Sequence, residues 1–362
     1  MIDDLHLCTR KGCAAPRDHL PAPDFDQSPR VAKQQPVAGS TEVRAGKIER
    51  LIATAIAIQA QDAEEAKEVG CIARAMIWAS MPHKEVDGAH YKRDNGLASI
   101  TMLVNPDIGL PYGKLPRLIA AWLTREAKRT RSRELHLGRS QAEFARKLGL
   151  LTNGGKRGDI PRLRQQATKL FGTFITVTPH QGQGYQYENV ALSDKGMLLW
   201  DPKKPYEQSL WQSKVVLSEA FFRECMDHAV PFDLRVLHLL RSPLAIDLYL
   251  WLTWRMFILR RSVLVPWISL RFQFGAGYAP TAQGMAHFRE AFHRCLREVS
   301  TLYPSARVTP ERDGLRLFPS PPHVSEIKRA LIRRGGQFDS IATTGDHEPA
   351  ELGMNHDQFS RG

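Results

Sequence analysis

Ile160-Pro-Arg-Leu-Arg-Gln-Gln-Ala-Thr-Lys-Leu-Phe171 is the stretch that decides the fold. Its apolar residues recur every three or four positions, which predicts a helix with one buried stripe. That stripe comprises Ile160, Leu163, Ala167, Leu170 and Phe171. The opposite face is expected to present Arg162, Gln165 and Lys169. A helix with an apolar side and an Arg/Gln/Lys side is suited to entering the major groove of DNA.

The flanking sequence predicts a helix-loop-helix followed by strands. Ser140 and Glu143 have the spacing of a capping box, and Asp159 suits the N-cap of the second helix. Strand-like segments rich in β-branched and aromatic residues follow, at Thr173–Thr178, Tyr185–Leu192 and Met197–Trp200. We interpret this order as a winged helix. The alternative is a small α/β unit whose basic face is only solvated.

Positive charge is concentrated around this stretch. The chain has 362 residues, 50 Lys and Arg against 38 Asp and Glu, and a net charge of +12. Residues 114–169 alone hold fifteen Lys and Arg against four Asp and Glu. A basic block on folded elements indicates a polyanionic partner. DNA is favoured over a membrane surface, because the apolar stripes are committed to a core rather than left for lipid.

Cysteine usage predicts neither a metal site nor disulfides. Cys71, Cys225 and Cys295 each fall in an apolar helical pattern, so buried free thiols are expected. One further set matches no common zinc spacing: His6, Cys8, Cys13 and His19. No secretory signal is evident, so we expect a cytoplasmic protein without cofactors.

The fold class expected is α+β and helix-rich, with two tandem winged-helix domains and disordered termini. Residues 1–44 are proline-containing and polar, which predicts a disordered tail. Residues 45–202 form the expected first domain, with N-terminal helices at 46–69 and from 72 to about 79. Residues 203–322 form the expected second domain. Residues 323–362 are a basic and polar tail, with a short basic helix expected at 325–334.

The second domain repeats the plan of the first. A strand at Lys214–Leu217 and a helix capped by Ser218 precede two further helices, Asp233–Leu240 and Pro243–Arg260. The last of these is apolar, but Asp247 would be costly in a bilayer, so a core helix is expected. A strand and helix within Val265–Phe274, a helix at Gln283–Leu302, and a hairpin of Arg307–Thr309 with Leu315–Phe318 complete the plan.

Two groups of cations are expected to assist the first recognition helix. The end of the helix at 115–130 carries candidate phosphate contacts, namely Lys128, Arg129, Arg131 and Arg133. A merely solvated helix end is equally consistent with those charges. The helix at 283–302 carries candidate base-reading residues, namely Arg289, His293 and Arg297. Glu290 and Glu298 share that face, so a dimer interface or a core-only role is the alternative.

Several motifs resemble the plasmid-encoded RepA-type replication initiators of bacteria. The main string is Leu110-Pro-Tyr-Gly-Lys-Leu-Pro-Arg-Leu-Ile119, followed by Ala121-Trp-Leu-Thr-Arg-Glu-Ala127. Further matching stretches are Met81-Pro-His-Lys84, Tyr91-Lys-Arg-Asp-Asn-Gly96, Leu137-Gly138, Phe144, Leu148-Gly-Leu150, Arg162-Leu-Arg164 and Leu170-Phe171. The similarity extends from about residue 48 to residue 318.

The resemblance implies tandem winged-helix domains that bind double-stranded repeats in a plasmid origin. It also implies that the protein helps to open the duplex and recruits host replication proteins such as an initiator and a helicase. Dimers in such families tend to be the restrained form. The recognition role implied for Arg162, Gln165 and Lys169 agrees with the reading of the residues themselves. A winged-helix transcriptional regulator or copy-number repressor is the alternative function.

No enzyme motif is complete, so an enzyme is not expected. Gly154-Gly-Lys-Arg157 lacks both the spacing and the hydroxyl of a phosphate-binding loop. The sequence has no His-x-His pair for a metal beside a nicking tyrosine, and no tight acidic cluster for a two-metal polymerase. His136 and His238 are expected to be packing residues.

Overall fold

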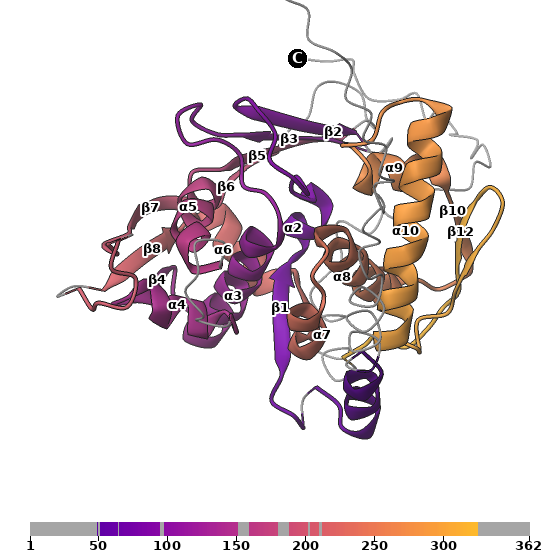
Figure 1. Ribbon diagram of the computed structural model, residues 1–362, viewed down its shortest axis with the longest axis horizontal. Helices are drawn as coiled ribbons and strands as arrows, with labels where there is room; N and C mark the ends of the chain where they lie inside the picture. The colour runs from indigo at the N-terminus through magenta and orange to yellow at the C-terminus, as the bar shows by residue number, and fades with distance from the viewer. Residues whose placement is uncertain are drawn as a thin grey trace, which may run out of the picture. The chain divides into compact units, whose positions relative to one another are not determined.

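The computed structural model describes residues 49–324, apart from 50, 64, 95–97, 151–158, 180–187, 202 and 210–211. Helices and strands are mixed along this part of the chain, which confirms the helix-rich α+β class (Figure 1). The predicted tails, the set from His6 to His19 and the side chain of Asp159 lie outside the described residues. The predicted division at residue 202 stays a prediction, but the strand at 214–217, expected to open the second domain, pairs instead with strands at 134–138 and 193–197.

Three helices and a three-stranded sheet form a first module around the stretch from 160 to 171. In chain order it consists of α3 (Lys114–Thr130), β4 (Glu134–Gly138), α4 (Gln141–Lys147), α5 (Asp159–Phe171), β7 (Ser193–Met197) and β8 (Ser213–Leu217). The strand order is β4-β8-β7, and both pairings are antiparallel. The last strand therefore lies in the middle of the sheet.

A second module repeats this arrangement. It consists of α8 (Pro243–Ile258), β10 (Val263–Pro266), α9 (Trp267–Phe274), α10 (Ala282–Leu302), β11 (Val308–Pro310) and β12 (Gly314–Leu317). The strand order is β10-β12-β11, so the last strand again lies in the middle. Each module thus has a helix, a strand, two helices and a hairpin, in the order predicted for a helix-turn-helix with a β-wing.

The repeat extends to individual side chains. Trp-Leu-Thr occurs at 122–124 in α3 and at 251–253 in α8. Trp122 meets the ring of Phe144 on α4 at 5.1 Å between centroids, and Trp251 meets Phe274 on α9 at 5.5 Å, both edge-on at 87°. In each module the first helix is therefore joined to the second by the same aromatic pair.

The wing of the first module differs from the prediction. The strands that follow α5, β5 (Phe174–Pro179) and β6 (Glu188–Ala191), join β2 (His90–Asp94) and β3 (Ala98–Leu103) in a separate sheet of order β2-β3-β5-β6. The hairpin that pairs with β4 is instead β7 and β8. Residue types at 173–192 identified strands correctly, but they carry no information on which strand each one pairs with.

The two halves of the chain share a strand pair that the sequence did not reveal. β1 (Val69–Ala73) pairs antiparallel with β9 (Ala229–Asp233) along all five residues of each. Helical structure was predicted up to Val69 and again from Ile72, which is wrong. The helix of residues 51–60 ends earlier, and α2 (Arg74–Ala79) starts after the strand. A short apolar run does not by itself distinguish a buried strand from a helix.

The predicted helix caps are present. The Ser140 hydroxyl accepts a hydrogen bond from the amide of Glu143 at 3.1 Å, and the Glu143 carboxylate accepts one from the amide of Arg139 at 2.8 Å. The carboxylate therefore reaches one residue further back than in the usual capping box. Ser218 caps α6 (Glu219–Asp227) by accepting from the amide of Phe221 at 3.0 Å. Short β9 leads directly into α7 (Leu234–Leu239).

Helix α8 is a core helix, as expected. Eleven of its sixteen residues are buried, including Asp247. Among the residues that the structure describes, no helix has the length and apolar character needed to cross a bilayer. The cysteines Cys71, Cys225 and Cys295 are buried free thiols, also as expected.

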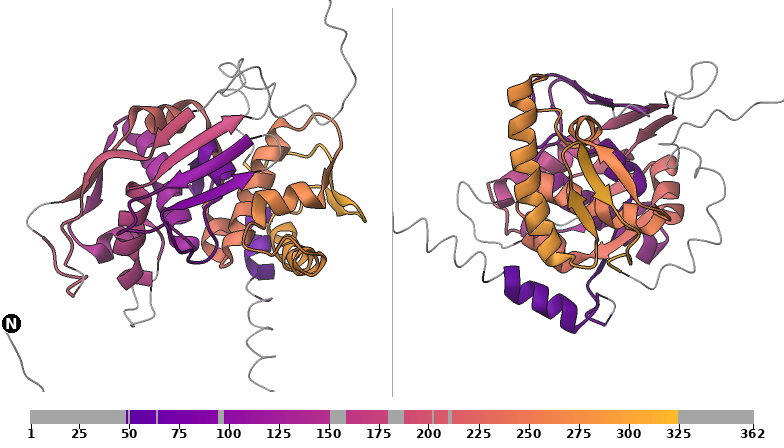
Figure 2. Two further views of the ribbon diagram at one scale, coloured as in Figure 1. Left: turned by 90° about the horizontal axis from the view of Figure 1, so that it is seen from above. Right: turned by 90° about the vertical axis from the view of Figure 1, so that its right-hand side faces the viewer.

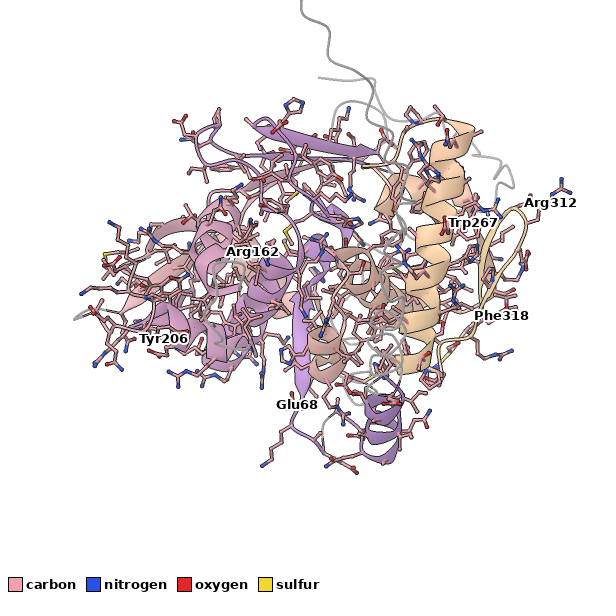
Figure 3. All side chains as sticks on the ribbon, viewed as in Figure 1. Glu68, Arg162, Tyr206, Trp267, Arg312 and Phe318 are labelled. Carbon is pink, nitrogen blue, oxygen red and sulfur yellow. The ribbon has the colours of Figure 1, made fainter. Side chains whose placement is uncertain are left out.

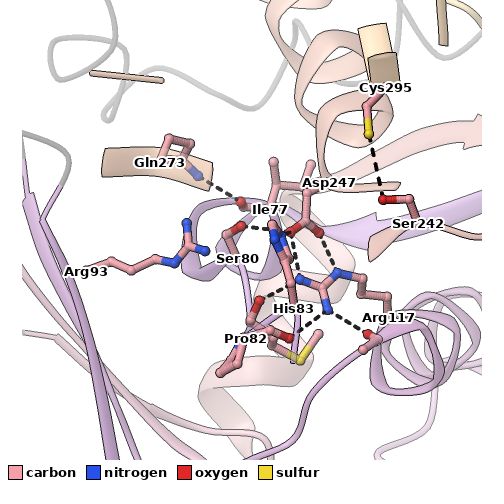
Figure 4. Close-up of polar contacts among 12 residues, drawn as sticks. Ile77, Ser80, Pro82, His83, Arg93, Arg117, Ser242, Asp247, Gln273 and Cys295 are labelled. Atoms are coloured by element: carbon pink, nitrogen blue, oxygen red, sulfur yellow. Dashed lines mark hydrogen bonds and ion pairs between the residues drawn. The ribbon is translucent and has the colours of Figure 1, made fainter. Parts of the chain in front are cut away.

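An ion pair between Arg117 on α3 and Asp247 on α8 joins the two modules (Figure 4). Arg117 Nε donates to Asp247 Oδ1 at 2.6 Å, and Nη2 donates to Oδ2 at 2.7 Å. The remaining guanidinium donors bind the carbonyls of Met81 and Gly113 at 2.6 Å and of Pro82 at 3.4 Å. All five N–H groups of this buried arginine therefore have acceptors.

The Asp247 carboxylate has two further donors. Its Oδ2 accepts from Ser80 Oγ and from His83 Nε2, each at 2.9 Å. Burial raises the pKa of Asp247, but Arg117 and His83 lower it by more, so this pKa lies well below the ordinary value. Burial lowers the pKa of His83, with Asp247 opposing, so the ring is neutral at pH 7 and donates one hydrogen bond. The pair is thus compensated although it lies in the core.

Substituting only one partner of the Arg117–Asp247 ion pair should destabilise the whole protein. We expect Asp247→Asn to lower the free energy of unfolding by about 3–5 kcal/mol, because Arg117 then keeps a buried uncompensated charge. The double variant Arg117→Met, Asp247→Leu should lose much less than the sum of the two single changes. Urea unfolding compares the natural protein, Asp247→Asn, Arg117→Met, Asp247→Leu and the double variant, and strictly additive losses for the last three would contradict the interpretation.

The Arg117–Asp247 pair also predicts how the free energy of unfolding depends on pH. Because the pKa of Asp247 is depressed in the folded state, its contribution is complete above the unfolded value of about 4 and is lost as pH falls below it. The stability difference between the natural protein and Asp247→Asn should therefore be constant from pH 7 to about 5 and shrink below about 4.

Candidate nucleic-acid interface

Helix α5 has the buried stripe that its periodicity predicts. Ile160, Leu163, Ala167 and Leu170 are at most 1% exposed, and Phe171 is half-buried. The side-chain amide of Gln141 at the start of α4 donates to the carbonyl of Ile160. Helices α4 and α5 are thus fastened to each other at the start of each, which fixes how α5 presents its other face.

The exposed face of α5 is confined to its first three turns. Arg162, which is labelled in Figure 3, Gln165 and Thr168 are exposed, and Arg164 is half-buried. Thr168 and Arg164 were not selected from the sequence, although both flank the predicted stripe. Recognition helices contact base edges chiefly through their N-terminal residues. The accessible part of α5 is therefore the part that such contacts require.

Lys169 does not lie on the exposed face, and the prediction that it projects into solvent is wrong. Its side chain is only 7% exposed; its Nζ lies 3.3 Å from Glu85 Oε1 and 5.0 Å from the centre of the Tyr112 ring. The loop at Gly109 also covers it, since a Cβ there would meet Nζ at 3.4 Å. Helical periodicity placed Lys169 beside Arg162 correctly, but it cannot show that another segment covers that turn.

The same loop covers the neighbouring residue on α5. Gln166 is buried, and its Oε1 accepts the backbone amide of Tyr112 at 3.0 Å. Burial and the nearby Glu85 raise the pKa of Tyr112, while Arg162 opposes the shift. Arg162 therefore lies at the margin of this covered region, close to the phenol.

The cations at the end of α3 divide into two kinds. Lys128 Nζ donates to the carbonyl of Met226 at 3.2 Å, which places the charge at the C-terminal end of α6. Arg133 Nε donates to the carbonyl of Leu217 at 2.8 Å, and its guanidinium pairs with Asp194 and Glu219. These two side chains hold elements of the fold together.

Arg129 and Arg131 are the exposed members of that group. Arg129 pairs with Glu126 at 2.5 Å, but its side chain is 67% exposed, so the pair is readily exchanged for another anion. Arg131 ends α3 in a left-handed conformation, with φ 55° and its amide bonded to the carbonyl of Ala127 at 2.8 Å. Both remain candidates for phosphate contact.

In the second module two of the three predicted base-reading residues contact an aromatic ring. The Arg289 guanidinium lies 4.9 Å from the ring centre of Trp267, and the His293 ring lies 5.0 Å from it. Burial, Arg289 and Arg297 lower the pKa of His293, so this ring is neutral at pH 7. Arg297 is exposed on α10. Arg289 and His293 are half-buried, which leaves Arg297 as the most accessible of the three.

The hairpin of the second module presents a cation that the sequence analysis missed. Arg312 is exposed and projects from the turn between β11 and β12 (Figure 3). The turn is fixed by Trp267, whose indole N–H donates to the carbonyl of Glu311 at 3.1 Å and whose amide donates to Asp313 at 3.1 Å. The Asp-Gly turn signal next to an arginine could have pointed to this position.

Within the described ranges no group of three or more His, Cys, Asp or Glu side chains is arranged to hold a metal ion. The largest pKa shifts belong to buried residues such as Asp247, Tyr249 and Cys225. The exposed face of α5 consists of a cation, an amide and a hydroxyl, those of Arg162, Gln165 and Thr168. These groups are suited to binding phosphates and base edges.

The positions of Lys169 and Arg162 predict different losses of stability for the same substitution. Lys169→Met should lower the free energy of unfolding by about 1–3 kcal/mol, because a covered hydrogen bond and ring contact are lost. Arg162→Met, the matched change on the exposed face, should stay within about 0.5 kcal/mol of the natural protein. Thermal unfolding of both variants measures this, and equal losses would contradict the placement of Lys169.

Comparison with known proteins supports the sequence resemblance. Residues 110–267 match the family described as plasmid encoded RepA protein. Two crystal structures of domains 2 and 3 of RctB are also similar. One has a TM-score of 0.45 at 11% identity and covers 68% of this chain and 99% of that chain. The other has a TM-score of 0.42 at 13% identity, with coverage of 67% and 94%. No curated protein sequence matches.

Proposed function

We propose that this chain, whose residues 110–267 match the plasmid-encoded RepA family, is a plasmid replication initiator that binds double-stranded repeats at its origin. The observation that carries the proposal is the exposed Arg162, Gln165 and Thr168 face of α5, held by a buried stripe. The net charge of +11 over residues 114–169 supports a nucleic acid as the partner.

In the binding mode that we propose, the first turns of α5 enter a major groove. Arg162 can donate two hydrogen bonds to a guanine, and Gln165 can bind an adenine in the same bidentate way. Arg129 and Arg131 then contact phosphates, which set register and supply salt-dependent affinity. Lys169 contributes through the position of the loop at 109–112 rather than by touching a base.

The second module would bind an adjacent part of the same site. Arg297 on α10 and Arg312 at the hairpin turn are two of its exposed cations. Because Arg117 and Asp247 fasten the two modules together, they would meet DNA in a fixed relation. A duplex that must fit two rigid surfaces is bent or untwisted, at a cost that depends on its sequence. That deformation is the step by which we propose that binding favours opening.

The base-reading role is tested by selectivity. Arg162→Ala combined with Gln165→Ala should weaken binding to the cognate repeat by about 100-fold or more, because each bidentate contact contributes about 1–3 kcal/mol. Binding to random DNA should fall only a few-fold. Fluorescence anisotropy at fixed salt measures both, with Arg223→Ala on α6 as the control for loss of an exposed charge. Equal losses on the two DNAs would mean that α5 reads no bases.

Duplex opening separates the initiator from its alternative. On a supercoiled plasmid carrying the origin, adding the protein should make thymines of an adjacent A·T-rich segment reactive to permanganate. A winged-helix transcriptional regulator or copy-number repressor would protect the repeats without this reactivity. A footprint without opening, under conditions in which host initiator is also present, would favour the regulator.

The remaining features follow the same proposal. The protein would act without catalysis of its own in a bacterial cytoplasm, recruit host replication proteins such as an initiator and a helicase, and have a homodimer as its restrained form. Incubation of origin DNA with Mg²⁺ and nucleotides should then give neither cleavage nor synthesis.

A further inference from the structure

The helix of residues 51–60 has apolar residues on two faces. Ala55 and Ile58 are each 8% exposed and belong to the core, whereas Ile52 is 48% exposed and Ile56 is 60% exposed. Single exposed isoleucines are ordinary, but these two are four residues apart and therefore form one stripe. The described part of the chain leaves this stripe uncovered.

A cavity of about 190 Å³ lies beside the same helix. Gln59 and Asp62 line it from the helix side, and Ser305 and His323 line it from the segment after α10. Figure 2 shows this indigo helix beside one end of α10 in the right-hand view. Gln59 follows Ile56 by three positions, so the cavity continues the exposed stripe of Ile52 and Ile56.

The chain leaves the described region at this cavity. His323 is fixed there, since its Nδ1 lies 2.7 Å from the Tyr249 hydroxyl and its ring stacks on Tyr303 at 4.4 Å. Val324, the last described residue, is 4% exposed. The continuation of the chain therefore starts next to Gln59, and three residues can extend about 10 Å. The stripe begins about 5 Å along the helix axis from Gln59.

The residues that follow Val324 include apolar side chains that could cover this exposed stripe. Ser325–Arg334 reads Ser-Glu-Ile-Lys-Arg-Ala-Leu-Ile-Arg-Arg, so Ile327, Ala330 and Leu331 recur at helical spacing. This apolar spacing is the one needed to cover Ile52 and Ile56, which are also four residues apart.

We propose that residues 325–334 of the same chain bind along the exposed face of the helix of residues 51–60. Ile327, Ala330 and Leu331 cover Ile52 and Ile56. This contact joins the helix of residues 51–60 to the segment that follows the second module. It is independent of the DNA-binding proposal.

Hydrogen exchange tests this contact in the full chain. Leu331→Asp should raise the exchange rates of amides in 51–60 by about tenfold or more, because burial of one leucine corresponds to at least that equilibrium constant. Ile332→Asp is the matched control, since it makes the same change at the adjacent position, about 100° away around a helix. In the Ile332→Asp variant, the amides of residues 51–60 should exchange at the same rates as in the natural chain. The proposal would be overturned if both variants raised these exchange rates equally, or if neither variant raised them.

A covalent test distinguishes this tail from a second copy of the chain. In a background with Cys8→Ser and Cys13→Ser, the pair Ile56→Cys and Leu331→Cys should form a disulfide within one chain on mild oxidation. Peptide mapping of the monomer band under non-reducing conditions identifies it. The pair Ile56→Cys and Ile332→Cys should form this disulfide within one chain at a yield at least several-fold lower. Disulfides found only between chains would show that another copy occupies the stripe, and the proposal would be rejected.

Discussion

The buried bond between Arg117 and Asp247 is the constraint on which the rest of this structure depends. A charge in a protein core is tolerated only when its hydrogen-bonding groups are satisfied, and here both partners meet that condition. Arg117 requires the carbonyls of Met81, Pro82 and Gly113, so it fixes the two loops that cover the far end of α5. One ion pair therefore positions the second module and limits which part of α5 remains exposed.

This bond also explains the residues that carry the family resemblance. In the Tyr112–Arg117 string, Arg117 supplies the five donors, and Gly113 adopts φ 78°, a conformation that favours glycine, while offering its carbonyl. Met81-Pro-His83 supplies two acceptors and a donor to Asp247. These residues are recognisable in the sequence, and so is the cost of Asp247 in a membrane, but two residues 130 positions apart give no local sign that they will pair.

Helix faces and helix caps were predictable from the sequence, whereas strand partners and the burial of a side chain beneath a distant loop were not. The buried stripe of α5, the caps at Ser140 and Ser218 and the order of elements in the second module depend on neighbours within a few residues, and the structure confirms them. The partner of β5, the strand pair of β1 with β9 and the burial of Lys169 depend on segments distant in sequence. Among the site residues, periodicity chose the correct face of α5 and failed only where a loop lies over it.

The central claim is that two similar modules are held rigidly, so that α5 and α10 meet DNA in one fixed relation. Spin labels at Gln165→Cys and Arg297→Cys, in a background with Cys8→Ser and Cys13→Ser, measure this directly by pulsed electron resonance. The account predicts a single narrow distribution of distances between the two labels when Arg117 and Asp247 are unchanged, and a broad distribution after Asp247→Asn. A broad or multiple distribution with the Arg117–Asp247 pair intact would contradict it.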